Sequence, residues 1–428
     1  MPRSVPFPCS AFISGLNRIT VAASLMVCGF SNIVSAAPLT LTDAFGLVIK
    51  NHPVIAAKRD EFQAAQHGVD GAKWQRFPSL SGQSSANNES GSVTTLRLEQ
   101  PLWTGGRITA AIQSSEAKLA AAAAAVEEAE QSMLLRVATN FLELVRLNAR
   151  MEAAEENIAE HERLLALIER RSAQGIGSPS EVITAKARLQ RARSERLQLQ
   201  TAAFNARADL SQATGTTVSE IRVPKPDLNT TGDLTTMVQK VLDHSPQMRR
   251  LHAETSSITA DVQLKKSALN PQIAVRHEFL KGKNYPSTAT YLALTLQTGN
   301  GLSSISAIDE VRAQESASAY KEQATLKDIS DSIRTDWNKV QSAREEAAIL
   351  RELVSVTRSM YESYVRQYAA GRKSWLDVLN ARSESIQARY SLIDTEWSGA
   401  LSAIKLQIAA GELTGASADD VRNQAEQH

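Results

Sequence analysis

Two long stretches of the chain carry an apolar residue at every seventh position. The first holds two such rows, Ile112, Leu119, Val126, Met133 and Val137, Leu144, Met151, Ile158, Leu165; the second holds Ala319, Leu326, Ile333, Val340, Ala347, Val354, Tyr361, Tyr368. Heptads sustained this far predict helices that supercoil around neighbouring helices. Flanking glycines place the helices at about 106–174 and 303–370, and at about 1.5 Å per residue each spans about 100 Å.

Shorter helical segments lie before and after each long helix. The expected ranges are 43–74 and 233–268, stopped by Pro78 and Pro271, and then 180–213 and 375–410. Two short segments together match the length of one long helix. We therefore expect a layer in which two short helices, end to end, lie beside each long one.

Alternating apolar residues predict strands between the helices. In the second half Ile273, Val275, His277 and Phe279 alternate with Ala274, Arg276 and Glu278, and Leu292, Leu294 and Leu296 alternate after a turn. The first half is weaker. Residues 79–91 (SLSGQSSANNESG) resemble a loop when taken alone, and only Val93 to Leu102 has a strand pattern. We count two strands per half by analogy.

Turn residues repeat about 195 residues later along the chain. The matching pairs are Asn51-His52-Pro53 with His244-Ser245-Pro246, Phe77-Pro78 with Asn270-Pro271, Gly175 with Gly371, and Gly215 with Gly411. We therefore expect two structural repeats, 37–222 and 233–412, joined by a linker at 223–232 and followed by a polar tail at 413–428.

The N-terminus has the pattern of a secretory signal. Arg3 and Arg18 precede an apolar run at 19–30, and small residues follow up to Ala36, so we expect residues 1–36 to be removed. The apolar run is too short to cross a bilayer, and no later stretch reaches roughly 18 apolar residues. We expect an exported protein.

Both cysteines, Cys9 and Cys28, fall in this segment. Lipid attachment at Cys28 is disfavoured because the bulky Val27 precedes it, but the sequence leaves this question open. The remaining chain has no disulfide framework.

Charge and motif content disfavour enzymes and nucleic-acid binders. The chain has 47 basic and 46 acidic residues, so no basic excess suggests a nucleic-acid partner. The seven histidines include no pair at metal-ligand spacing beside an acid, and no P-loop or nucleophile elbow occurs. We expect no catalytic site, metal or cofactor.

Four strands in one chain raise the question of their edges. If the sheet lies in a bilayer, each unpaired N–H or C=O group costs several kcal/mol, so the edges must close on other copies. Three copies give twelve strands, within the range of outer-membrane barrels. The pattern alone also fits a small soluble sheet that caps a coiled coil.

Two motifs and the duplicated plan resemble the TolC family of outer-membrane export channels. They are the junction QPLWTGG at 100–106 and the turn YAAGRKSWLDVLNA at 368–381. The resemblance extends from about Leu39 to Leu413. The junction of the second half, at 295–301, lacks the aromatic residue, and Asn380 replaces an acid of the family's turn.

The resemblance implies a mainly α fold with a small β part. A homotrimer would form a twelve-stranded transmembrane β-barrel in outer-membrane lipid and a periplasmic α-barrel of coiled-coil hairpins. It would bind a periplasmic adaptor (membrane fusion protein) and an inner-membrane transporter.

For the cargo, we favour type I protein secretion with an ABC-type transporter over multidrug efflux, because acylated efflux members usually carry a clear lipid-attachment cysteine. The cargo itself stays open. A soluble periplasmic scaffold or adaptor is an alternative of another class, although adaptors usually have one hairpin per chain, flanked by β-rich domains.

Two acids follow the hairpin turns at equivalent places. A threefold axis would make Glu181 and Asp377 into acidic rings at the channel entrance, a device that favours cations. Both acids also follow Ser178 or Ser374 at the spacing of a helix capping box. The sequence leaves both roles open.

The family resemblance also implies links that close the entrance. By matching positions, Tyr368 would pair with Glu181, and Lys373 with the neighbourhood of Ser180; exposed pairs worth about 0 to 1 kcal/mol break readily. Alternatively, Tyr368 only ends its heptad row and Lys373 is a solvated charge. The turns are expected to contact the adaptor, although their glycines also end helices; they comprise Gly175, Ile176, Gly177, Gly371 and Arg372.

Overall fold

A computed structural model describes residues 38–87, 91–228, 232–281, 286–296 and 303–413. The expected signal peptide, Cys28, the junction at 297–301 and the tail beyond 413 lie outside these residues. In the described part of the chain, no helix is long and apolar enough to cross a membrane.

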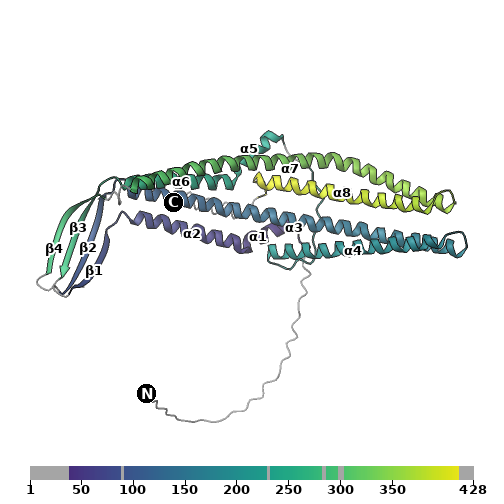
Figure 1. Ribbon diagram of the computed structural model, residues 1–428, viewed down its shortest axis with the longest axis horizontal. Coiled ribbons are helices and arrows are strands. Elements are labelled where there is room, and N and C mark those ends of the chain that lie inside the picture. Colours follow the sequence, from purple (N-terminus) through teal and green to yellow (C-terminus); the bar gives the residue numbers. More distant parts are fainter. Residues whose placement is uncertain (1–37, 88–90, 229–231, 282–285, 297–302, 414–428) are drawn as a thin grey trace, which may run out of the picture. The chain divides into compact units, whose positions relative to one another are not determined.

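The two halves repeat one order of elements (Figure 1). The first half contains α1 (Leu41–Asn51), α2 (Pro53–Trp74), β1 (Ser79–Asn87), β2 (Gly91–Trp103), α3 (Arg107–Ala173) and α4 (Pro179–Thr214). The second contains α5 (Leu234–His244), α6 (Pro246–Ser267), β3 (Gln272–Lys281), β4 (Pro286–Thr295), α7 (Ser303–Ala369) and α8 (Trp375–Ala409). The long helices α3 and α7 have 67 residues each, as the heptads predict.

The expectation of one continuous opening helix in each half was wrong. The helix breaks between α1 and α2 at His52, and between α5 and α6 at Ser245, because each residue precedes a proline and is held in an extended conformation. The His52 Nδ1 then accepts a hydrogen bond from the amide of Val54 at 3.3 Å. The residue that ends one helix therefore caps the next.

The shorter helices pack against the two long helices, α3 and α7. Helices α2 and α4 pack mainly on α3, while α6 and α8 pack on both α3 and α7. Helix α1 contacts both α2 and α4, which fits the expected end-to-end stacking of short helices (Figure 1). Helices α2 and α4 thus form one outer side of the layer, and α7 forms the other.

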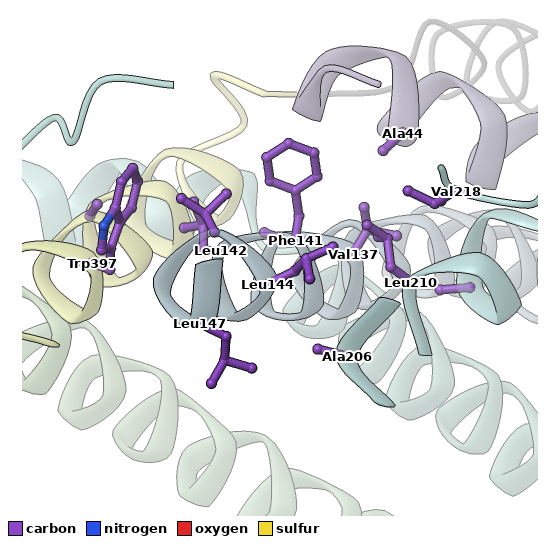
Figure 2. Close-up of a cluster of buried hydrophobic side chains, with 14 of the residues drawn as sticks. Ala44, Val137, Phe141, Leu142, Leu144, Leu147, Ala206, Leu210, Val218 and Trp397 are labelled. Carbon is purple, nitrogen blue, oxygen red and sulfur yellow. The ribbon is translucent and has the colours of Figure 1, made fainter. Parts of the chain in front are cut away.

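The largest hydrophobic cluster surrounds the middle of α3. Phe141 and Leu144 of this helix are completely buried. Figure 2 shows side chains of α3 among Ala44 of α1, Leu210 of α4 and Trp397 of α8. This core fixes the two hairpins, α3–α4 and α7–α8, against each other.

The four strands form one antiparallel sheet in the order β1-β2-β3-β4. Residues 79–91 resemble a loop when taken alone, but the second strand that we expected in the first half is confirmed, because β1 pairs with β2 from Ser79 opposite Glu99 to Asn87 opposite Gly91. Its polar residues need no apolar alternation, since pairing with β2 holds the strand in place by satisfying the backbone groups that face β2.

The Gly105-Gly106 junction connects β2 to α3 and contacts the second half. The Gly105 carbonyl accepts a 2.9 Å hydrogen bond from Asn270 Nδ2. Gly105 has a φ of 61°, and a Cβ there would lie 2.4 Å from that of Asn270. Only glycine fits this close approach, which explains the first glycine of the motif.

Candidate functional site

The two hairpin turns share one backbone conformation. Gly175 and Gly371 are left-handed, with φ of 74° and 73°. The amide of the next residue, Ile176 or Arg372, donates to a carbonyl of the preceding helix at 3.0 or 2.9 Å. Glycine ends both long helices in the same way, because the left-handed region strains other residues.

Asp377 caps its own helix. Its amide donates to Ser374 Oγ at 3.2 Å, and its carboxylate accepts from the Ser374 amide at 3.2 Å, so the expected capping box is present at the start of α8. The Ser374 hydrogen bonds, and next the charge of Lys373, lower the pKa of Asp377. The carboxylate therefore has a local structural role.

Glu181 makes no such box, so of the two roles that the sequence left open, the capping box is absent at this position. Ser178 Oγ accepts from the Ser180 amide at 3.3 Å instead, one residue earlier than the box requires. The Glu181 carboxylate extends to α7, where the hydroxyl of Tyr368 donates to it at 3.4 Å. The two acids occupy matching places and make different contacts.

Tyr368 lies at the centre of the contact between the hairpins. Only 4% of it is exposed, and its ring centre is 5.5 Å from that of Trp375. Burial, and then the charge of Glu181, raise the pKa of the phenol. The phenol therefore stays a hydrogen-bond donor at neutral pH. Arg171 of α3, which the sequence analysis did not single out, also contacts it.

The ion pair and the cation–π contact of Lys373 both lie within the second hairpin. Its Nζ lies 3.9 Å from Asp377 and 4.3 Å from the ring centre of Tyr364. Ser180 shares a 2.8 Å hydrogen bond with Ser178. In the described part of the chain, no hydrogen bond joins Lys373 to Ser180.

A hydrophobic cluster lies behind these polar contacts. It contains Leu164, Ile168, Ala185, Tyr361, Tyr368, Trp375, Val378, Leu379 and Ala381. Its members come from all four helices of the two hairpins. The cluster therefore packs the tips of the two hairpins against each other.

The sheet has one charged face and one apolar face. Two ion pairs cross between β2 and β3: Arg97 Nε lies 2.5 Å from Glu278 Oε1, and Arg276 Nε lies 2.8 Å from Glu99 Oε2. The strand register puts these four side chains on the same face. The opposite face carries exposed apolar residues, Leu80, Leu96, Leu98, Phe279, Leu292 and Leu294. Such a sheet can separate lipid from water.

Comparisons with known proteins agree on one family. The model of the outer membrane efflux protein family matches residues 45–216 and 237–412. The outer membrane efflux protein BepC of Brucella suis biovar 1 (strain 1330) is 21% identical over 422 residues, which cover 92% of this chain and 90% of BepC.

Solved structures show the same fold. The outer membrane protein VceC of Vibrio cholerae matches with a TM-score of 0.77 and 17% identity, over 87% of this chain and 96% of VceC. The CmeC outer membrane channel of Campylobacter jejuni matches with a TM-score of 0.78 and 14% identity, over 90% of this chain and 89% of CmeC.

These matches confirm the resemblance to the TolC family, and they contradict the alternative that the chain is a soluble scaffold or adaptor. The family consists of channels rather than enzymes, and its members reside in the outer membrane with their helical part in the periplasm. Because the family model covers most of its length, the chain belongs to the outer membrane efflux protein family.

Proposed function

We propose that three copies of this chain close into one ring and form the exit duct of a tripartite export system. The observation that carries the proposal is that the two edge strands of the sheet connect directly to the two outer sides of the helical layer. Strand β1 is one edge of the sheet and follows α2, whereas β4 is the other edge and precedes α7. Helices α2 and α7 are outer helices of the layer, so a neighbour that closes the sheet also closes the helices.

Exposed apolar rows on the outer helices support this closure. Ile183, Leu197 and Phe204 of α4 are 70%, 62% and 69% exposed, at spacings that are multiples of seven. Ile349 and Val356 of α7, also seven apart, are 68% and 57% exposed. Heptad rows indicate helical partners. Because the two rows lie on different sides of the chain, the contact between copies is heterologous, and such contacts close a ring when the rotation per copy is a whole fraction of a turn.

The faces of the sheet support a water-filled barrel. Twelve strands from three copies would leave no open edge in the bilayer. The leucine-rich face would then meet lipid. The face with the Arg97–Glu278 and Arg276–Glu99 pairs would line the lumen, where water solvates the charges.

The tips support an entrance that is closed at rest. The Tyr368–Glu181 hydrogen bond joins the hairpins of one chain, and Lys373 would join neighbouring copies near Ser180. Threefold symmetry would multiply Asp377 and Glu181 into rings of charge. The adaptor would engage the exposed turns at Gly175 and Gly371 and release these links.

For the cargo we propose small-molecule efflux, because the curated relative BepC is named an efflux protein. Type I protein secretion with an ABC transporter remains the second candidate, favoured by the poor lipid-attachment sequence before Cys28. In a deletion strain, dye accumulation with normal protein secretion would support efflux. Loss of one large secreted protein with unchanged dye levels would support secretion.

Fractionation tests the duct itself. We expect heat-sensitive trimers in outer-membrane extracts and cation-preferring channels in planar bilayers. Recovery of a soluble periplasmic monomer, without channel activity in the membrane fraction, would refute the proposed assembly.

A further inference from the structure

We propose that Arg171 is a positioning residue of the entrance: it clamps the end of α7 and thereby sets how readily the Tyr368–Glu181 link opens. The inference rests on the proposed function, in which that link closes the channel. It assigns a role to a residue of the first hairpin that the turn motif does not include.

The geometry of Arg171 is that of a clamp on a helix end. Its Nη1 donates to the carbonyl of Ala369 at 3.2 Å and to that of Tyr368 at 3.4 Å. Helix α7 ends at Ala369, so these carbonyls belong to its last turn, where helix carbonyls lack partners within the helix and a cation is favourable.

The same guanidinium also covers an aromatic ring. Its central carbon lies 4.7 Å from the centre of the Tyr368 ring, within the range of cation–π attraction. Arg171 therefore fixes both the backbone and the side chain of Tyr368. Lysine could reach the carbonyls but lacks the planar group that donates and stacks together.

The first hairpin thus holds Tyr368 at two points. Arg171 of α3 contacts its ring and carbonyl, and Glu181 of α4 accepts from its hydroxyl. Tyr368 belongs to the second hairpin, so both contacts cross between hairpins. If the α7–α8 hairpin moves to open the entrance, both contacts must break together.

The second repeat lacks a matching clamp. Aligning Gly175 with Gly371 places Gln367 opposite Arg171, and Gln367 donates to Ser363 of its own helix at 3.1 Å. Duplication alone does not account for Arg171. The contact with α7 depends on the side chain present in the first half only.

Channel recordings of purified trimers in planar bilayers test the clamp. We expect Arg171→Ala to raise the open fraction roughly five- to tenfold, as expected for losing a cation–π contact and a helix-end contact. Arg171→Lys should give a smaller rise. Arg170→Ala is the matched control, because Arg170 donates to Ala166 within its own helix and should leave the open fraction unchanged.

A second variant, Arg171→Met, keeps the test decisive if Arg171→Ala fails to fold or assemble. Arg171→Met keeps the packing of the stem and removes the charge; if Arg171→Ala yields no trimers, the expected rise is measured on this variant. A wild-type open fraction in assembled Arg171→Met or Arg171→Ala channels would overturn the inference.

Tyr368→Phe separates the two proposals, because it removes only the hydroxyl that bonds Glu181. If Tyr368→Phe opens the channel and Arg171→Ala does not, the clamp is wrong and the gate stands. If neither variant changes the open fraction, the proposed gate fails as well.

Discussion

The two hairpin tips have nearly the same backbone and different side chains. The first tip carries Arg171 and Glu181, which reach across to the other hairpin. The second carries Tyr368 and Trp375, which are buried, and Asp377, which caps its own helix. The duplicated turn is kept because glycine must end each long helix. The side chains differ because the two hairpins must fit each other.

Substitution in the aromatic core of the second tip should give the largest difference in stability between matching positions of the two tips. Trp375 is 4% exposed, so Trp375→Ala should destabilise the protein by about 3–5 kcal/mol. Its counterpart Pro179 lies at the first helical position, and Pro179→Ala should cost less than about 1 kcal/mol. Urea unfolding of the detergent-solubilised protein measures both. Equal losses would contradict the assignment of the core to the second tip.

Substitutions of the two turn glycines should have the same effect, because the two tips share this backbone conformation. Gly175→Ala and Gly371→Ala each force a side chain into a left-handed conformation and should cost about 1 kcal/mol. The same unfolding assay applies, with Gly46→Ala as a control at a helical glycine without a crowded Cβ. A large difference between the two turn variants would show that their environments, rather than their backbones, dominate.

Ion selectivity tests whether the acids also face the lumen. The double change Asp377→Asn with Glu181→Gln should lower the cation preference of the channel and weaken block by trivalent cations, because two rings of charge are removed. Reversal potentials in a salt gradient give the permeability ratio. Unchanged selectivity would confine Asp377 to its cap and Glu181 to its bond with Tyr368.

The smallest effect should be the pH dependence of the Asp377 cap. The folded state lowers the pKa of this carboxyl, so its contribution to stability is complete above the unfolded pKa, about 3.9, and is lost as pH falls through the lower folded value. The stability gap between wild type and Asp377→Asn should therefore be constant near neutral pH and shrink only in strong acid. A gap that changes between pH 6 and 8 would point to another group.

Much of the architecture was readable from local patterns. Heptads and glycines predicted all four ends of α3 and α7 to within one residue, since helix periodicity and helix termination are properties of neighbouring residues. The break at His52 was also readable from Pro53, but the long helical pattern outweighed it. Strand β1 was predicted only from its counterpart in the second half, because its stability comes from pairing with β2 and leaves little trace in its own residues.

The sequence by itself determined the repeat of turns, the lengths of the long helices and the family. The cap of Asp377 by Ser374 could also be expected from spacing, and the pair of Tyr368 with Glu181 from the family resemblance. Only the tertiary structure decided that Glu181 makes no cap and that Arg171 joins the contact between the hairpins.

The local sequence does not indicate that Ser178 accepts from Ser180 rather than from Glu181. The contact of Glu181 with Tyr368, a residue of the other half, was expected from the family resemblance alone. Arg171 looks like any charged helix residue until folding places the end of α7 beside it. Caps and periodicity depend on adjacent residues, whereas these contacts depend on how two distant hairpins pack.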